Sequence, residues 1–191
     1  MTDPIIHELI RRRWSPTEFT CGLLATEDVQ RLLEAARWAP SCFNEQPWRF
    51  LVAPRDRVQA FERLAACLNP KNRQWARHAS LLLLTTAKMT FTGSAKPNRH
   101  ALHDVGLAVA QLTLQATSMG LGVHQMAGFD AQKARDTYSI PNDFVPVSML
   151  AVGFSSNPNE ARVHQRARNP LGTLAFEEAW GSPYSARTAA D

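Results

Sequence analysis

The stretch that decides the fold is RHALHDVGLAVAQLTLQATSM, residues 99–119. Apolar residues recur along it at helical spacing, and they are Ala101, Val105, Ala108, Val109, Leu112 and Ala116. Leu102, Leu107 and Leu114 extend the apolar surface almost all the way round. The pattern therefore predicts one long buried helix, closed by Gly120 in a C-cap.

Shorter runs on either side predict the strands of a sheet and the helices that cover it. The expected strands are Trp48 to Ala53, Ser80 to Ala87, Gly122 to Ala127 and Val145 to Phe154. The expected further helices are Pro4 to Arg13, Thr26 to about Ala39, Val58 to Leu68 and Ala131 to Tyr138. Asp3 is expected to cap the first helix, and Asn69-Pro70 to break the third.

Strands that alternate with long helices over unequal connections favour an α+β or α/β sandwich built on one sheet. We see no repeat and no linker, so we expect a single domain over residues 1–191, with a loose tail at 182–191. The polar, glycine-containing stretch Met89 to Asn98 is expected to form a mobile loop or lid.

Composition narrows the functional classes. No run of about 18 apolar residues occurs, so we expect no membrane partner. The N-terminal stretch lacks an apolar signal core, which favours a cytoplasmic protein. The three cysteines, Cys21, Cys42 and Cys67, have no metal-binding spacing. They are expected to be reduced thiols, with no metal site.

The net charge of +4 is compatible with binding nucleic acid or a phosphorylated ligand. The arginines fall mainly in two groups, Arg11–Arg13 and Arg162–Arg168, and the other basic residues are interspersed with acids. Two small clusters suit one phosphate better than a long polyanion. We therefore expect no nucleic-acid partner.

Two segments could bind that phosphate. RRRWSPTEF, residues 11–19, combines guanidinium groups with a serine hydroxyl, and RARNPL, residues 166–171, places Arg166 and Arg168 on one side of an extended chain. Each has a plainer interpretation. Basic residues also complement the C-terminal end of a helix, or form a solvated turn.

Two further segments are suited to a flat heterocycle. APSCFNEQPW, residues 39–48, concentrates hydrogen-bonding side chains between two prolines, although an Asx-type turn would have a similar composition. GLGVHQMAGFD, residues 120–130, has glycines that allow a close backbone approach. It follows a helix and is no GxGxxG motif, so a Rossmann fold is rejected. His124 has no partner at catalytic or metal spacing and is expected to be structural.

Signatures of a protein nucleophile are missing from the sequence. No GxSxG, HExxH, Walker A or paired catalytic carboxylates occur. If the chain is an enzyme, a cofactor is expected to carry the chemistry, with no catalytic side chain.

Together and in this order, the four segments resemble the nitroreductase family, from about Ile6 to Phe176. The resemblance implies an α+β three-layer sandwich, in which a central, mostly antiparallel sheet is flanked by helices. It also implies an intertwined homodimer with two FMN molecules at its interface, each touched by both chains.

The resemblance also implies the residues that bind FMN. Phosphate ligands would be Arg13, Ser15, Arg166 and Arg168. The full set is Arg13, Trp14, Ser15, Thr17, Pro40, Ser41, Cys42, Asn44, Gln46, Asn72, Gln125, Met126, Ala127, Gly128, Arg166 and Arg168.

The implied activity is that of an NAD(P)H-dependent flavin oxidoreductase with ping-pong kinetics. NADH or NADPH would give a hydride to flavin N5 and leave, and a small acceptor such as a nitroaromatic or a quinone would then occupy the same slot. Two alternatives stay open. One is other flavin chemistry on the same fold, such as dehalogenation or enal reduction, and the other is a non-enzymatic flavin-storage protein.

Overall fold

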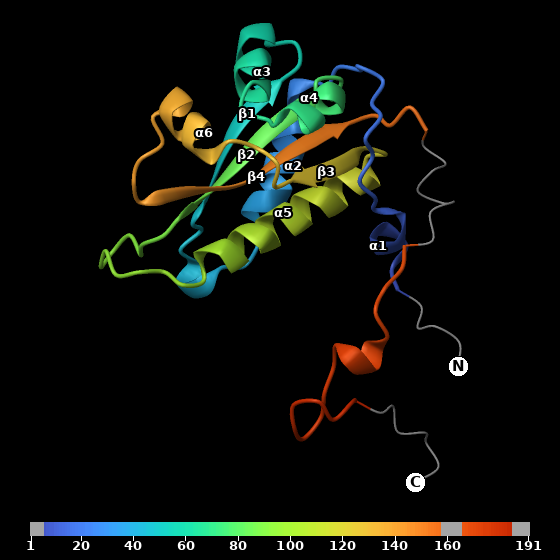
Figure 1. The fold of residues 1–191 in the computed structure, drawn as a ribbon, viewed down its shortest axis with the longest axis vertical. Helices are drawn as coiled ribbons and strands as arrows, with labels where there is room; N and C mark the ends of the chain where they lie inside the picture. Colours follow the sequence, from blue (N-terminus) through green and yellow to red (C-terminus); the bar gives the residue numbers. More distant parts are fainter. Residues whose placement is uncertain (1–5, 158–165, 185–191) are drawn as a thin grey trace. The chain divides into compact units, whose positions relative to one another are not determined.

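The computed structural model describes residues 6–157 and 166–184, and the chain divides into two compact units, Met1–Ala161 and Arg162–Asp191. The first unit is built on a four-stranded sheet with the order β1-β2-β4-β3 (Figure 1). Its strands are β1 (Trp48–Pro54), β2 (Leu81–Lys88), β3 (Gly122–Met126) and β4 (Phe144–Gly153). All three pairings are antiparallel. The four predicted strands are confirmed, each end within one residue.

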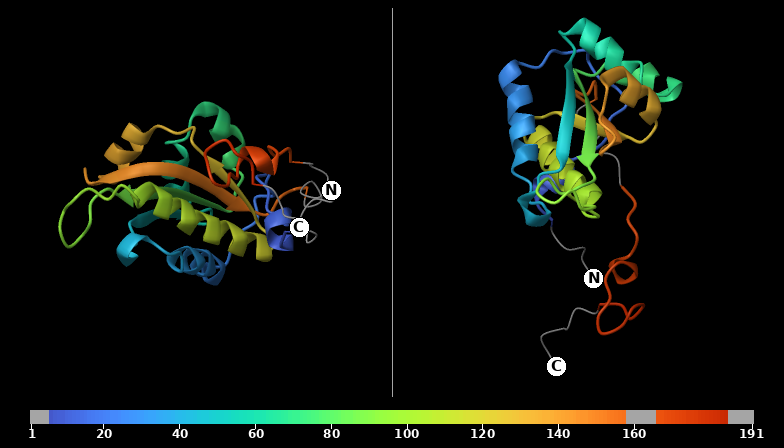
Figure 2. Two further views of the ribbon diagram at one scale, coloured as in Figure 1. Left: turned by 90° about the horizontal axis from the view of Figure 1, so that it is seen from below. Right: turned by 90° about the vertical axis from the view of Figure 1, so that its left-hand side faces the viewer.

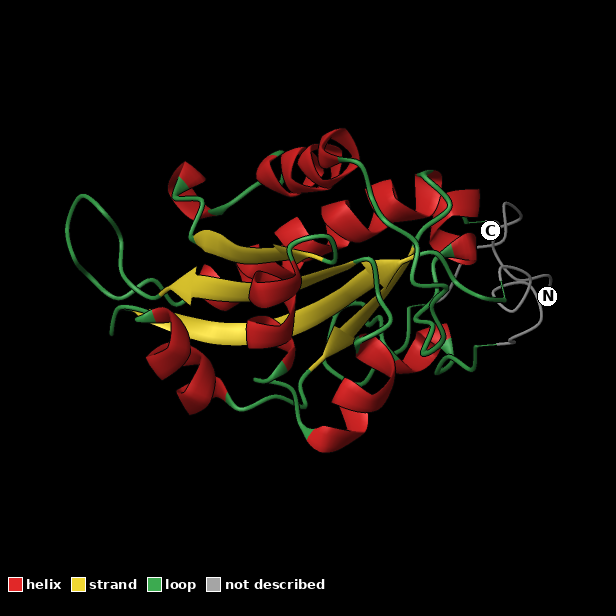
Figure 3. Ribbon diagram, turned by 90° about the horizontal axis from the view of Figure 1, so that it is seen from above, coloured by secondary structure: helices red, strands yellow, loops and turns green. Residues whose placement is uncertain are grey.

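Alternating side chains of the central strand β2 divide the core between the two faces of the sheet. Leu81 and Leu83 pack with residues of α2 (Thr26–Arg37) and α5 (Ala101–Ser118). Leu82 and Leu84 pack with residues of α3 (Val58–Ala65), α4 (Pro70–Ala76) and α6 (Ala131–Tyr138). Figures 2 and 3 show these helices on both faces of the sheet. The antiparallel sheet between two helical layers confirms the α+β sandwich.

The long helix α5 is confirmed, but the chain does not bury it all round. Val105, Ala108 and Leu112 are buried against the sheet. Leu102 remains 48% exposed. Gly106 and Ala110, one and two turns further on, are exposed as well. These three positions follow one another at intervals of four and form an uncovered stripe along the helix.

Two helix boundaries differ from the prediction. The first helix, α1, spans only Glu8–Arg12, and the His7 side chain caps it by accepting a hydrogen bond from the backbone N–H of Leu9 at 3.2 Å. The predicted cap, Asp3, lies outside the described residues. The third predicted helix ends at Ala65 instead of Leu68. Asn69-Pro70 then begins a helix that was not predicted, α4, because the Asn69 side chain caps the backbone N–H of Asn72 at 2.8 Å.

The expected lid, Met89 to Asn98, folds back on itself. Thr90 and Pro97 form an isolated β-bridge, and the backbone N–H of Phe91 donates to the carbonyl of Lys96 at 2.8 Å. Its mobility stays a prediction.

The second unit contains the short 3-10 helix η2 (Leu171–Thr173) and a bridge between Phe176 and Pro183. Of the tail that was expected to be loose, residues 185–191 lie outside the described residues, and the single-domain assignment stays a prediction.

Candidate functional site

The loop between α2 and β1 has an unusual backbone. It contains the 3-10 helix η1 (Cys42–Asn44), and three of its non-glycine residues have positive φ, namely Phe43 at 52°, Asn44 at 55° and Gln46 at 49°. The left-handed conformation costs an L-residue roughly 1–2 kcal/mol. Strain of this kind persists only where surrounding contacts impose it, and it concentrates at binding and active sites. The loop is therefore a candidate functional element.

Hydrogen bonds impose the shape of this loop. The Ser41 hydroxyl accepts from the backbone N–H of Gln46 at 3.0 Å, and the Gln46 side-chain amide donates to the carbonyl of Asn44 at 3.2 Å. The backbone N–H of Cys42 donates at 3.0 Å to Oδ2 of Asp104, a buried residue on α5. Sequence reasoning missed Asp104, because only the folded chain brings positions 42 and 104 together.

A second group of predicted residues follows α1 in the chain and lies beside the start of β3 in the fold. Nη1 of Arg13 donates to the Ser15 hydroxyl at 3.4 Å, so the two predicted phosphate ligands are neighbours. Arg13 and Trp14 are half-buried, whereas Ser15 is exposed, as is Thr17. Pro16, next in the chain, packs against Gly122, where an added Cβ would lie 2.4 Å from the Pro16 ring. Arg13 and Ser15 are therefore held beside the first residue of β3.

His124 is structural, as predicted. Its Nδ1 lies 3.0 Å from the carbonyl oxygen of Pro16, within hydrogen-bonding distance, and its ring centroid lies 4.6 Å from that of Trp75. These contacts join β3 to the segment after α1 and to α4. His124 thus helps to hold the predicted phosphate-binding segment in place.

A third group joins α4 to the end of β3. The Asn72 side-chain amide donates to the carbonyl of Gly128 at 3.0 Å. A Cβ on Gly128 would lie 2.3 Å from Nδ2 of Asn69 and 2.6 Å from that of Asn72, so a side chain at this position would displace both amides. The Met126 side chain is buried in the core, which leaves only its backbone available to a ligand. Gln125 and Ala127 are exposed on either side of it.

The first two groups lie near opposite ends of α5. The loop of residues 40–47 is tied through Cys42 to the first turn of the helix, at Asp104. The Arg13–Ser15 segment lies beside Gly122, four residues after the helix ends at Ser118. An 18-residue α-helix is about 27 Å long. Figure 1 shows the same separation, with α1 near one end of α5 and the loop before β1 near the other.

The last predicted pair belongs to the second unit. Arg166 is half-buried, and Arg168 is exposed with its Nη1 donating to the carbonyl of Ala167 at 2.8 Å. That both arginines meet one phosphate together with Arg13 stays a prediction. Residues 162–165 of the same basic cluster lie outside the described residues.

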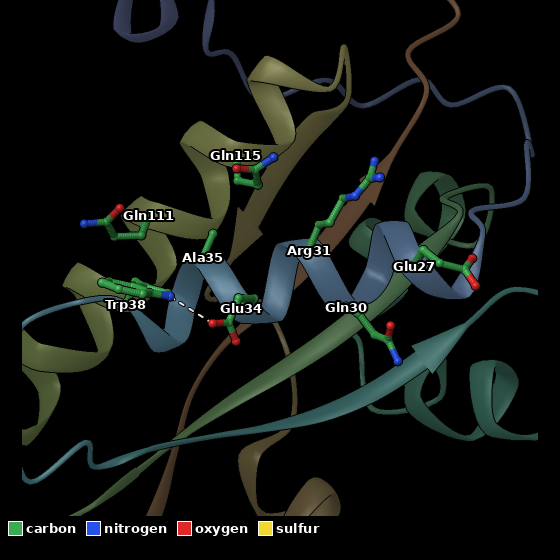
Figure 4. A pocket seen from close by; sticks show the side chains of 8 residues that line it. All are labelled: Glu27, Gln30, Arg31, Glu34, Ala35, Trp38, Gln111 and Gln115. Carbon is green, nitrogen blue, oxygen red and sulfur yellow. Dashed lines mark hydrogen bonds between the residues drawn. The ribbon is translucent and has the colours of Figure 1, made fainter.

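A separate groove lies between α2 and α5 (Figure 4). It is lined by Glu27, Gln30, Arg31, Glu34, Ala35, Trp38, Gln111 and Gln115. Hydrogen bonds from Arg37 and from the Trp38 indole lower the pKa of Glu34 to about 2. None of the sixteen residues predicted to bind FMN lines this groove.

Two negative findings apply to residues 6–157 and 166–184. No group of three or more His, Cys, Asp or Glu side chains is arranged to hold a metal ion. In the same parts of the chain, no helix has the length and apolar character needed to cross a membrane. All three cysteines are free thiols.

Comparison with known proteins supplies the family. The model of the nitroreductase family matches residues 10–154. The chain is 30% identical over 179 residues to Protein DrgA of Synechocystis, covering 79% of this chain and 85% of that protein. It is also 33% identical over 93 residues to the Major NAD(P)H-flavin oxidoreductase of Aliivibrio fischeri, covering 48% of this chain and 43% of that protein.

Among solved structures, a crystal structure of an oxidoreductase containing FMN superposes with a TM-score of 0.87 at 29% identity. The match covers 95% of this chain and 96% of the other. Because the family model spans well over half of the 191 residues, and the fold agrees along nearly the whole chain, this chain belongs to the nitroreductase family.

Proposed function

We propose that this protein is an FMN-dependent oxidoreductase that passes electrons from NADH or NADPH to a small acceptor such as a nitroaromatic or a quinone. One observation carries the proposal, namely the likeness to the FMN-containing oxidoreductase over 95% of this chain. The name of the Aliivibrio fischeri relative supports a nicotinamide nucleotide as the electron donor.

The residues present fit FMN. Arg13 and Ser15 offer a guanidinium and a hydroxyl 3.4 Å apart, which suits a phosphate. The glycine at position 128 lets the amides of Asn69 and Asn72 pack against its backbone, which places Asn72 beside the segment expected to meet the ring. When bound, FMN would supply the redox chemistry, and the protein would contribute binding, orientation and electrostatics.

The position of the loop of residues 40–47 favours a site shared between two chains. In one chain this loop and the Arg13–Ser15 segment lie near opposite ends of α5, a helix about 27 Å long. We infer that a second copy brings its loop to the phosphate-binding segment of the first. The uncovered stripe of Leu102, Gly106 and Ala110 on α5 supports such a homodimer, because apolar and small residues allow helices to pack closely.

We expect donor and acceptor to occupy the same place in turn, which gives ping-pong kinetics. The predicted contacts of Gln125 to Gly128, on one side of the ring, would then orient either molecule. Binding and orientation alone can supply a large share of the rate enhancement, because they replace an encounter of two free molecules by a reaction within one complex.

The cofactor can be identified directly. The purified protein is heated, and any released chromophore is identified by mass. FMN is the expected result. Colourless protein that takes up no added FMN would contradict the proposed function, and FAD would contradict the assignment of a terminal phosphate to Arg13 and Ser15.

A further inference from the structure

Asp104 is a buried carboxylate that connects two distant parts of the chain. It lies on the first turn of α5 and is only 2% exposed. Oδ2 accepts the hydrogen bond from the backbone N–H of Cys42 at 3.0 Å, and Oδ1 lies 3.3 Å from Nδ1 of His103. Burying a carboxylate is unfavourable unless donors compensate for the lost water. The carboxylate of Asp104 is therefore expected to have a role that depends on its hydrogen bonds.

This role concerns the strained loop that Asp104 holds. Four hydrogen bonds join residues 41–46 to one another. The first half of the loop is tied to α5 through Asp104. The second half is tied to β1 by Arg49, whose Nη1 donates to the carbonyl of Gln46 at 3.0 Å, and to residues 89–98 by Thr92, which donates to the Glu45 carboxylate. Three left-handed residues lie between or next to these ties and oppose them. Removing one tie should let the loop relax.

We propose that Asp104 is a positioning residue for the flavin. Its carboxylate fixes the backbone of residues 41–46 in the conformation that meets the ring and ribityl chain. This inference rests on the proposed function. It goes beyond that function because Asp104 is not among the sixteen residues predicted to bind FMN and would act through the backbone of Cys42.

The placement of Asp104 also fits a site shared between two copies. Its side chain leaves α5 on a buried face, whereas Leu102 and Gly106 on the same turns belong to the uncovered stripe. One short stretch of α5 would thus carry both the proposed contact with the second copy and the tie to the loop. The carboxylate would then set the position of the loop relative to the neighbouring chain.

The first test measures the binding of FMN and of riboflavin to Asp104→Ala and Asp104→Asn. Loss of a hydrogen bond to a charged group should weaken binding by about tenfold to a hundredfold in Asp104→Ala. Asn keeps an acceptor oxygen, so Asp104→Asn should bind more tightly than Asp104→Ala. The affinity for riboflavin should fall as much as the affinity for FMN, because the loop is expected to meet the ring and the ribityl chain and not the phosphate.

A matched control separates positioning from general stability. Val105 is the next residue on α5 and is buried, and its apolar side chain can accept no hydrogen bond from the loop. Val105→Ala should lower the thermal midpoint and leave both flavin affinities close to those of the wild type. If Val105→Ala weakens flavin binding as much as Asp104→Ala does, the positioning role is wrong.

The donor can be removed without touching Asp104. Ser41 has φ −148° and ψ 158°, which is the extended conformation that a residue before proline prefers, and Cys42 is the first residue of the 3-10 turn. Cys42→Pro therefore deletes the N–H at a position whose preceding residue already has the conformation that proline requires. Cys42→Ala keeps the N–H and shows what loss of the thiol alone does to flavin affinity. The further loss of affinity in Cys42→Pro should match the loss of affinity in Asp104→Ala. If Asp104→Ala fails to fold, the comparison of Cys42→Pro with Cys42→Ala still shows whether the hydrogen bond to Asp104 affects flavin affinity.

The outcomes separate the two claims. Wild-type protein that binds neither flavin would overturn the proposed function itself. Wild-type protein that binds FMN, together with folded Asp104→Ala and Cys42→Pro variants of unchanged flavin affinity, would overturn the role of Asp104 alone. A weakened affinity in both variants, accompanied by a shifted flavin absorption spectrum, supports it.

Discussion

The carboxylate of Glu45 accepts two hydrogen bonds from Thr92, one from the backbone N–H at 2.7 Å and one from the hydroxyl. Nζ of Lys88 donates to the same hydroxyl at 2.8 Å. The rings of Phe43 and Phe91 meet edge to face, with centroids 5.9 Å apart. These contacts fasten the loop of residues 89–98 to the strained loop before β1. The expected lid is therefore attached to the candidate flavin site through side chains of both loops.

This attachment should weaken in acid. The hydrogen bonds from the hydroxyl and then the backbone of Thr92 hold the pKa of Glu45 below its usual range. A group whose pKa is lowered by folding stabilises the folded arrangement above its unfolded pKa and loses that contribution as the pH falls through the lowered value. We expect the hydrogen-exchange protection factor of the Thr92 amide to be constant near neutrality and to fall in acid.

Glu45→Ala checks the cause of that fall. The variant should show low protection of the Thr92 amide at every pH, while amides in β2 behave as in the wild type. A wild-type protection factor that does not change with pH, or a variant that protects Thr92 normally, would show that Glu45 does not hold the loop.

The phosphate assignment predicts a selective loss of affinity. If Arg13, Arg166 and Arg168 meet on one phosphate, each truncation to Ala removes a charge-assisted hydrogen bond worth about 1.5–3 kcal/mol. FMN affinity should then fall roughly tenfold to a hundredfold for each arginine. Riboflavin lacks the phosphate, so its affinity should hardly change. Titration of the three variants with both flavins makes the measurement, and equal losses for FMN and riboflavin would mean that these arginines support the fold instead.

The uncovered stripe on α5 predicts an obligate homodimer. Light scattering at low concentration should give the mass of two chains. Ala110→Glu places a charge in the middle of the stripe, and it should produce monomers that no longer retain FMN, because the site would be incomplete. Gln59→Glu, an exposed position on α3, is the matched control and should remain dimeric. A wild-type monomer that is stable and loaded with flavin would rule out this assembly.

The parts of the fold that depend on local sequence could be predicted. The leucines of β2 and the helical pattern of α5 determine their elements because the hydrophobic periodicity is long and unbroken. The helix α4 was missed although its signal is present. Asn69-Pro70 is an N-cap followed by proline at the first helical position, and it was interpreted as a break.

The site could be predicted only in part. The segments that carry Arg13, Ser41 and Gly128 were found from residue types, and the resemblance supplied their roles. The left-handed backbone at Phe43 and Asn44 could not be predicted, because contacts with other parts of the fold impose that unfavourable conformation. The tie from Cys42 to Asp104 is tertiary, and no spacing rule brings those two positions together.

The proposed function is tested most directly by anaerobic reduction of the flavin. The protein is saturated with FMN, separated from free flavin, and mixed without oxygen with NADH or NADPH while the visible absorption of the flavin is followed. We predict that at least one nucleotide bleaches this absorption and that a quinone or a nitroaromatic then restores it. Protein that retains no FMN, or bound FMN that neither nucleotide bleaches, would contradict the proposed function.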